Sequence, residues 1–184
     1  VITALLAATM VASLAVGCGN KGGDSKSDSS KSSSSDEITI GFSQVGAESD
    51  WRTANSESMK STFSEKNGYK LIFDDAQQKQ ENQITAIRNF IQQEVDYIVL
   101  APVTESGWDT VLQEAKDAEI PVIIVDRMID VSDDSLYTAW VGSNFKMEGQ
   151  KACEWLNAYA EAKGMKEVNI AHIQGTIGAS AQIG

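Results

Sequence analysis

Cysteine and histidine are scarce in this sequence of 184 residues, which has only Cys18, Cys153 and His172. Two distant cysteines cannot build a disulfide framework or a paired-cysteine metal site. Cys153 lies in an amphipathic segment, so we expect a buried, unreactive thiol. His172 lies in a strand-like stretch, where a place in the sheet is commoner than a catalytic role. We therefore expect no metal site and no cofactor.

Basic residues are also few: 15 Lys and Arg stand against 26 Asp and Glu, for a formal net charge of -11. Lysines and aspartates balance in residues 19–36, and residues 1–18 carry no charge, so the excess lies on the remainder of the chain. Proteins that bind nucleic acid need a basic surface. We expect no nucleic-acid partner.

Motifs of nucleotide-binding or hydrolytic enzymes are missing as well. The glycine-rich end "GTIGASAQIG" fits neither the phosphate-loop nor the dinucleotide spacing. Glu48 and Asp50 lie near each other, but nothing else suggests the carboxylate pair of a glycosidase. We therefore expect that the protein is not an enzyme.

The chain begins with an uncharged apolar run over residues 1–17, which is typical of an export signal. The run is shorter than the roughly 20 residues that a membrane-spanning helix needs. It ends in "AVGC", which resembles a bacterial lipobox, although Ala15 stands where Leu is usual. We interpret residues 1–18 as a lipoprotein signal with Cys18 lipidated, the alternative being an ordinary cleaved signal. The Ser-rich segment 19–36 is expected to be a flexible tether.

Strand-like and helix-like segments alternate over residues 37–184. The expected strands are 38–43, 69–74, 97–102, 121–126, 136–143 and 167–174. The unbroken apolar runs "IVLA" and "VIIV" indicate strands covered on both faces, as in a parallel sheet. The pattern predicts an α/β fold with a doubly wound, mostly parallel sheet, forming one lobe over 37–184.

Capping signals place the ends of the expected helices. Asp50 is a candidate cap for the first helix, Ser106 and Asp109 can form a capping box for a later one, and Gly68 suits a helix end. The tryptophans at apolar periodic positions are expected in the core: Trp108, Trp140 and Trp155.

Polar segments follow five of the expected strands, and ligands of open α/β sheets bind beyond the carboxyl ends of strands. The five segments are "QVGAESDWR", "DAQQKQEN", "APVTESGW", "DRMID" and "QGTIGAS". Asp126 and Arg127 together could accept and donate hydrogen bonds to a ligand with many hydroxyl groups, or form a purely structural pair. Trp51 could stack on a sugar ring beside Arg52, or pack in the core.

At these residues the sequence resembles the periplasmic-type sugar-binding proteins of ABC transporters, in the ribose and galactose group that shares its lobe with LacI-type repressors. The segments "GFSQVGAESDWR", "QQKQENQ", "APVTESGW", "EAKDAEIPVIIVDR" and "QGTIGAS" are similar to those of its galactofuranose-binding branch. The similarity covers residues 38–180. It implies the N-terminal lobe of a type I periplasmic-binding-protein fold, in a fragment truncated at both ends that lacks the second lobe.

The resemblance also implies which residues contact the ligand, namely Glu48, Ser49, Asp50, Trp51, Arg52, Asp126 and Arg127. Asp50 stands where the galactofuranose-binding branch has Gly, and its side chain could reshape the pocket.

The function implied is capture of a galactofuranose-like monosaccharide between two lobes and its delivery to an ABC permease and ATPase. The protein would be extracytoplasmic and held to the cell membrane by its lipid. Two alternatives remain: a sugar sensor that presents its ligand to a membrane receptor kinase, and, less favoured, a surface carbohydrate-active enzyme.

Overall fold

The computed structural model describes residues 37–184. The expected lipoprotein signal, Cys18 and the tether over 19–36 lie outside these residues, so they stay predictions. Within residues 37–184, the helices are too short or too polar to cross a membrane.

Five parallel strands form one sheet in the order β2-β1-β3-β4-β5. The strands are β1 (Ile38–Gln44), β2 (Tyr69–Asp75), β3 (Tyr97–Leu100), β4 (Val122–Asp126) and β5 (Ala139–Gly142). This confirms five of the expected strands and the doubly wound parallel sheet. The strand order reverses between β1 and β3, and ligands of such sheets bind at that point, beyond the carboxyl ends of the strands.

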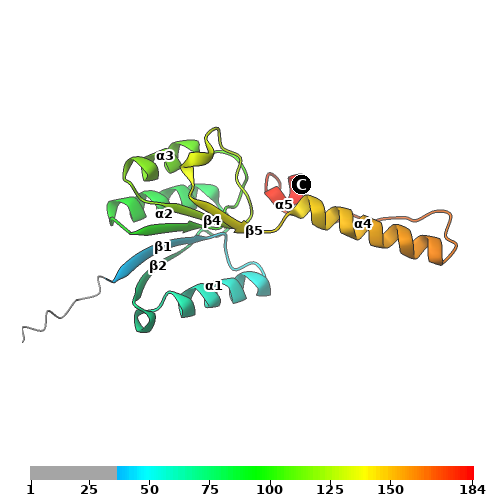
Figure 1. The fold of residues 1–184 in the computed structure, drawn as a ribbon, viewed down its shortest axis with the longest axis horizontal. Helices are drawn as coiled ribbons and strands as arrows, with labels where there is room; N and C mark the ends of the chain where they lie inside the picture. Colours follow the sequence, from blue (N-terminus) through cyan, green and yellow to red (C-terminus); the bar gives the residue numbers. More distant parts are fainter. Residues whose placement is uncertain (1–36) are drawn as a thin grey trace, which may run out of the picture. The chain divides into compact units, whose positions relative to one another are not determined.

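Helices cover both faces of the sheet, as the apolar runs of its central strands require. Figure 1 shows α2 and α3 on one face and α1 on the other. The helices are α1 (Asp50–Thr62), α2 (Gln80–Gln92), α3 (Asp109–Asp117), α4 (Phe145–Ala162) and α5 (Ser180–Ile183), with short 3-10 turns at Glu65–Asn67 and Asp134–Leu136.

Two apolar clusters, one on each face, form the core. Ile98 and Leu100 of β3 pack under α2 and α3, whereas the intervening Val99 faces the α1 side. Successive side chains of a strand point to opposite faces, so one apolar run supplies both clusters. On β1, Gly41 leaves room for the ring of Phe90, which would lie only 2.5 Å from an added Cβ.

The expected strand over 167–174 is absent, since these residues have no regular structure. β5 is the outermost strand, and no described strand pairs beyond it. The apolar Ile170 and Ile173 are therefore exposed. Helix α4 also buries no residue, so the core is confined almost wholly to residues 38–142. The prediction of a single lobe over 37–184 stays a prediction for its last forty or so residues.

Several side chains in or near this last part differ from expectation. Cys153 is exposed, not buried. Trp155 and Trp140 are also partly open to solvent, and only Trp108 of the three tryptophans lies in the core, fully buried. The reason is the same in each case: apolar spacing predicts a buried face, but burial needs a second element to pack against that face.

The two expected caps are wrong in detail. Ser49, not Asp50, caps α1, with its Oγ accepting from the backbone N of Arg52 at 3.2 Å. Trp108 occupies the N-cap of α3 without a side-chain bond, and the Asp109 carboxylate accepts from Ser132 instead. Gly68 ends the 3-10 turn after α1 in a left-handed conformation, with φ of 84°.

Candidate functional site

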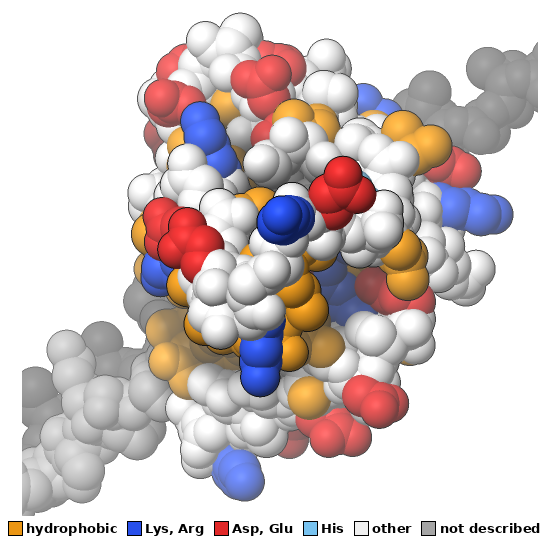
Figure 2. All heavy atoms as spheres, turned by 90° about the vertical axis from the view of Figure 1, so that its right-hand side faces the viewer, with side chains coloured by type: hydrophobic (Ala, Val, Ile, Leu, Met, Phe, Trp, Pro, Cys, Tyr) orange, Lys and Arg blue, Asp and Glu red, His pale blue; other side chains and the backbone are white. Residues whose placement is uncertain are grey.

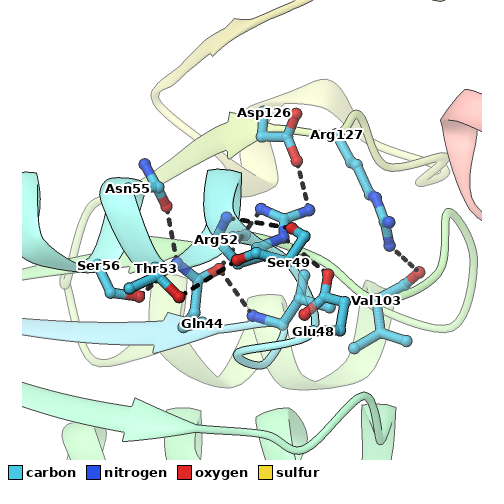
Figure 3. Close-up of polar contacts among 12 residues, drawn as sticks. Gln44, Glu48, Ser49, Arg52, Thr53, Asn55, Ser56, Val103, Asp126 and Arg127 are labelled. Atoms are coloured by element: carbon cyan, nitrogen blue, oxygen red, sulfur yellow. Dashed lines mark hydrogen bonds and ion pairs between the residues drawn. The ribbon is translucent and has the colours of Figure 1, made fainter.

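The guanidinium of Arg52 is the centre of the site at the carboxyl edge of the sheet. Arg52 lies in the first turn of α1 and is only 3% exposed. Its Nε donates to Glu48 Oε1 at 3.1 Å and its Nη2 to Asp126 Oδ2 at 2.6 Å (Figure 3). One side chain thus joins the loop after β1 to the end of β4, where Asp126 lies 74 residues after Arg52 in the sequence.

Asp126 reaches Arg52 from an unusual backbone conformation at the end of β4. Its φ is 65°, in the left-handed region that residues other than Gly rarely adopt. Its carbonyl oxygen accepts from Trp140 Nε1 at 3.3 Å. Gly142 of β5 pairs with it, and a Cβ at Gly142 would collide with the Asp126 carbonyl and the Trp140 ring. The carboxylate is therefore held by packing around its own backbone.

Arg127 turns away from Asp126, so the two residues do not form the pair that their adjacency suggested. Its Nη1 donates to the carbonyl of Val103 at 3.2 Å, in the loop after β3 (Figure 3). This is the one hydrogen bond that its side chain makes to residues 37–184, which leaves most of its N–H groups free. Burial lowers the pKa of Arg127, and the nearby charge of Arg52 lowers it further, whereas Asp126 and Glu48 raise it.

Trp51 lies beside this cluster and does not pack in the core. It is 55% exposed, and the Arg52 guanidinium carbon lies 4.8 Å from the centre of its ring system. A guanidinium over an indole face is a favourable cation–π contact that also orients the ring. An apolar ring face is therefore presented to solvent next to the charged groups.

Not all of the residues expected to bind ligand lie together in the structure. Glu48, Arg52 and Asp126 form one connected network, with Trp51 stacked on it. Ser49 acts through the helix cap, and Asp50 is an exposed residue of the first helical turn. The "QGTIGAS" segment also reaches this edge, because the Ser180 Oγ accepts from the backbone N of Met128 at 3.0 Å.

The charges of this cluster balance, with two guanidinium groups, Arg52 and Arg127, beside two carboxylates, Glu48 and Asp126. Such a site suits a neutral ligand whose hydroxyl groups both donate and accept hydrogen bonds. Within residues 37–184, no group of three or more His, Cys, Asp or Glu side chains could hold a metal ion. On the face drawn in Figure 2, acidic and basic side chains are scattered, and no continuous basic surface appears.

Two buried glutamines near the site were missed from the sequence. Gln44 and Gln83 are both fully buried and hydrogen-bonded. A signal for each was present: Gln44 ends a strand with apolar residues at alternate positions, and Gln83 occupies the buried stripe of α2 with Ile87 and Phe90. A buried polar side chain needs hydrogen-bond partners, so a glutamine at a core position indicates an ordered polar network nearby.

Comparison with known proteins identifies relatives of this chain. Residues 40–183 match the family model described as a periplasmic binding protein domain. The galactofuranose-binding protein YtfQ of Escherichia coli (strain K12) is 51% identical over 146 residues, 79% of this chain and 45% of that protein. The fructose import binding protein FruE of Bifidobacterium longum (strain NCC 2705) is 38% identical over 155 residues, 82% of this chain and 45% of that protein.

Solved structures similar to this chain are also of sugar-binding proteins. A Mycobacterium smegmatis protein in complex with β-D-fucofuranose is 50% identical with a TM-score of 0.75, covering 79% of this chain and 47% of that one. The binding component of the arabinose ABC transporter from Shewanella sp. ANA-3, bound to L-arabinofuranose, is 53% identical with a TM-score of 0.73, covering 79% and 47%. The chain thus spans about half the length of these relatives. The curated relatives are named as binding proteins, which confirms the expectation that the chain is not an enzyme.

Proposed function

Because this chain belongs to the periplasmic binding protein family, we propose that it is the sugar-binding half of a receptor that captures a monosaccharide for an ABC importer. The observation that carries the proposal is the charge-balanced cluster of Arg52, Glu48 and Asp126, with the exposed Trp51 and the free N–H groups of Arg127 beside it.

Each group has a definite task toward a sugar. The carboxylates of Glu48 and Asp126 retain lone pairs that accept hydrogen bonds from hydroxyl groups, because Arg52 occupies only one oxygen of each. Arg127 donates to hydroxyl oxygens through its free N–H groups. The exposed face of Trp51 covers the C–H surface of the ring. These contacts orient a neutral ligand without breaking any bond in it.

A five-membered sugar ring is the favoured cargo. Relatives about 50% identical to this chain are described with galactofuranose, β-D-fucofuranose and L-arabinofuranose. All three ligands share the furanose ring and differ in the groups attached to it. We therefore assign a galactofuranose-like monosaccharide as the ligand class.

Capture would need a second lobe opposite this edge of the sheet. The core of the described residues lies within 38–142, and this lobe supplies one wall of the crevice. A sugar that contacts both walls favours the closed form by its higher affinity for that form. The closed receptor would then deliver the sugar to the permease, with the ATPase driving import. Lipidation of Cys18 would hold the receptor outside the cytoplasm at the membrane.

The experiment that tests this function is calorimetric titration of the full-length mature protein with galactofuranose, arabinofuranose, galactopyranose and ribose. We expect tight binding to a furanose and weaker binding to the pyranose. Binding of the pyranose alone would overturn the furanose assignment. Absence of heat with every sugar would overturn the sugar-binding function itself.

A further inference from the structure

Gln44 and Gln83 are fully buried on opposite faces of the sheet, beneath the site. Gln44 is the last residue of β1, and Gln83 lies in the first turn of α2. A buried carboxamide without partners is costly, and a single Gln can make up to four hydrogen bonds. Both carboxamides form hydrogen bonds through their nitrogen and their oxygen. These hydrogen bonds connect Gln44 to Arg52 directly and Gln83 to Arg127 through one other residue.

Gln44 contacts Arg52 directly. Its Oε1 accepts from the backbone N of Val45 at 2.9 Å and lies 3.4 Å from Arg52 Nη1. Its Nε2 donates to Asn55 Oδ1 at 2.7 Å and to Ser56 Oγ at 3.1 Å, both on α1 (Figure 3). The carboxamide therefore fixes α1 against β1 and gives the Arg52 guanidinium its third acceptor.

Gln83 acts on Arg127 through one intervening residue. Its Oε1 accepts from the backbone N of Val103 at 2.9 Å, and its Nε2 donates to the carbonyl of Ala101 at 2.7 Å. These bonds hold the loop that follows β3. The Val103 carbonyl in that loop accepts from Arg127 Nη1 at 3.2 Å. Gln83 of α2 thus fixes the position of the Val103 carbonyl to which Arg127 donates.

We propose that Gln44 and Gln83 are positioning residues, Gln44 for Arg52 and Gln83 for Arg127, and that they set the affinity of the site although neither reaches its surface. An arginine side chain has many rotamers, and a ligand that must first order it binds less tightly. Binding sites lose function when their supporting residues let them shift by a fraction of an ångström. The effect on affinity rests on the proposed sugar-binding function; the effect on the arginines does not.

The first test needs no ligand. The full-length protein is labelled with ¹⁵N-arginine, and the Nε–Hε signals of Arg52, Arg127 and Arg88 are assigned by single Arg→Lys substitutions. Gln44→Leu should shift or broaden the Arg52 signal, and Gln83→Leu the Arg127 signal. Arg88 pairs with Glu114 at the surface and makes no hydrogen bond to either glutamine, so its signal should not respond. Unmoved Arg52 and Arg127 signals in both variants would overturn the proposal.

The second test measures sugar affinity in the same variants, at a temperature where circular dichroism shows each to be folded. Each Leu variant should raise Kd by about tenfold or more, the factor that corresponds to 1.4 kcal/mol. Gln44→Glu keeps an acceptor for Arg52 and should bind more tightly than Gln44→Leu.

Val111→Ala is the control for a general loss of stability, because Val111 is a buried residue of α3 and belongs to the apolar cluster of the core. We expect it to lower the melting temperature and leave Kd unchanged. If Val111→Ala raises Kd as much as the glutamine variants do, their role is only structural. If the wild type binds no sugar, the proposed function fails, and the arginine signals alone decide the positioning role.

Discussion

The two edges of the sheet are both rich in left-handed residues other than glycine, but they use them differently. At the edge where the strands begin, Glu94 and Glu119 have φ of 52° and 59° as α2 and α3 end. At the edge where the strands end, Asp126 has φ of 65°, and Gln77 and Gln78 after β2 have φ of 52° and 62°. Such a conformation costs about 1–2 kcal/mol for a residue with a side chain.

The difference lies in what the side chains do. Within residues 37–184, the carboxylates of Glu94 and Glu119 make no hydrogen bond, and their backbone serves only to end a helix. The Asp126 carboxylate instead holds Arg52 at 2.6 Å. Backbone strain at a helix end can be removed without loss of a side-chain interaction. Backbone strain at Asp126 is kept because its carboxylate binds Arg52. Four predictions test this contrast between the edges.

The largest effect is expected from Arg52→Ala. The change leaves the partly buried carboxylates of Glu48 and Asp126 without their cation, which should lower the free energy of unfolding by about 3 kcal/mol. Urea denaturation measures this value. The matched control is Arg88→Ala, which removes an exposed pair with Glu114 and should change stability very little, because water screens such pairs. Equal losses in the two variants would contradict the central role of Arg52.

Arg127→Ala should reduce sugar affinity by about 2 kcal/mol or more, because a site that reads hydroxyl groups loses a charged donor. Calorimetry on the full-length protein measures the effect. The reason differs from the one that adjacency suggests, since Asp126 keeps its partner Arg52 in this variant. Stability should fall less than in Arg52→Ala. Affinity equal to that of the wild type would remove Arg127 from the site.

Asp74→Asn should stabilise the protein at neutral pH by about 1 kcal/mol, because one buried oxygen of the charged Asp74 lacks a partner among the described residues, whereas Asn carries no charge to bury. Burial raises the pKa of Asp74, and the charge of Asp75 raises it further. A raised folded-state pKa means that wild-type stability falls as pH rises from about 3.8 through that pKa. The advantage of Asn should therefore shrink as the pH is lowered through this window.

Thermal unfolding at several pH values tests the Asp74 prediction. Asp75→Asn is the comparison, because the Oδ1 of Asp75 already accepts from the backbone N of Gln77 at 2.9 Å, so this change removes only the repulsion between the two carboxylates. It should give a smaller gain than Asp74→Asn. A constant advantage of Asp74→Asn at all pH values would show that ionisation of Asp74 is not the cause.

The smallest effect is expected from Glu119→Gly, which should stabilise by about 0.5 kcal/mol, since relief of left-handed strain exceeds the entropy cost of glycine. Chemical denaturation measures the change. The same substitution at Asp126 relieves similar strain but deletes the partner of Arg52, so it should destabilise. Changes of the same sign at both positions would remove the contrast between the edges.

Much of the fold was predictable because five of its strands carry their own signals. Apolar runs such as 97–100 and 122–125 need cover on both faces, and only a layered α/β fold supplies it. The sixth expected strand had the same local signal in 167–174 but does not pair with β5, the outermost strand of the described sheet. Periodicity identifies a segment that can be buried, while burial itself depends on what lies opposite.

The site was predictable in its residues and not in its connections. Strand ends meet at one edge, so the sequence located Glu48, Arg52, Asp126 and Arg127 there. It suggested Asp126 and Arg127 as a pair because they are adjacent. In the structure Asp126 binds Arg52 and Arg127 turns to Val103. Adjacent residues at the end of a strand point in different directions, so adjacency favours different partners.

The sequence by itself determined the alternation of strands and helices, the parallel sheet, and the edge at which polar residues gather, because these follow from local periodicity and chain direction. Only the tertiary structure decided which carboxylate binds which guanidinium, that Trp51 is exposed, and that Gln44 and Gln83 lie beneath the arginines. The pairing of Arg52 with Asp126 joins residues 74 positions apart, and its geometry is set by the packing of helices on the sheet, which no local pattern specifies.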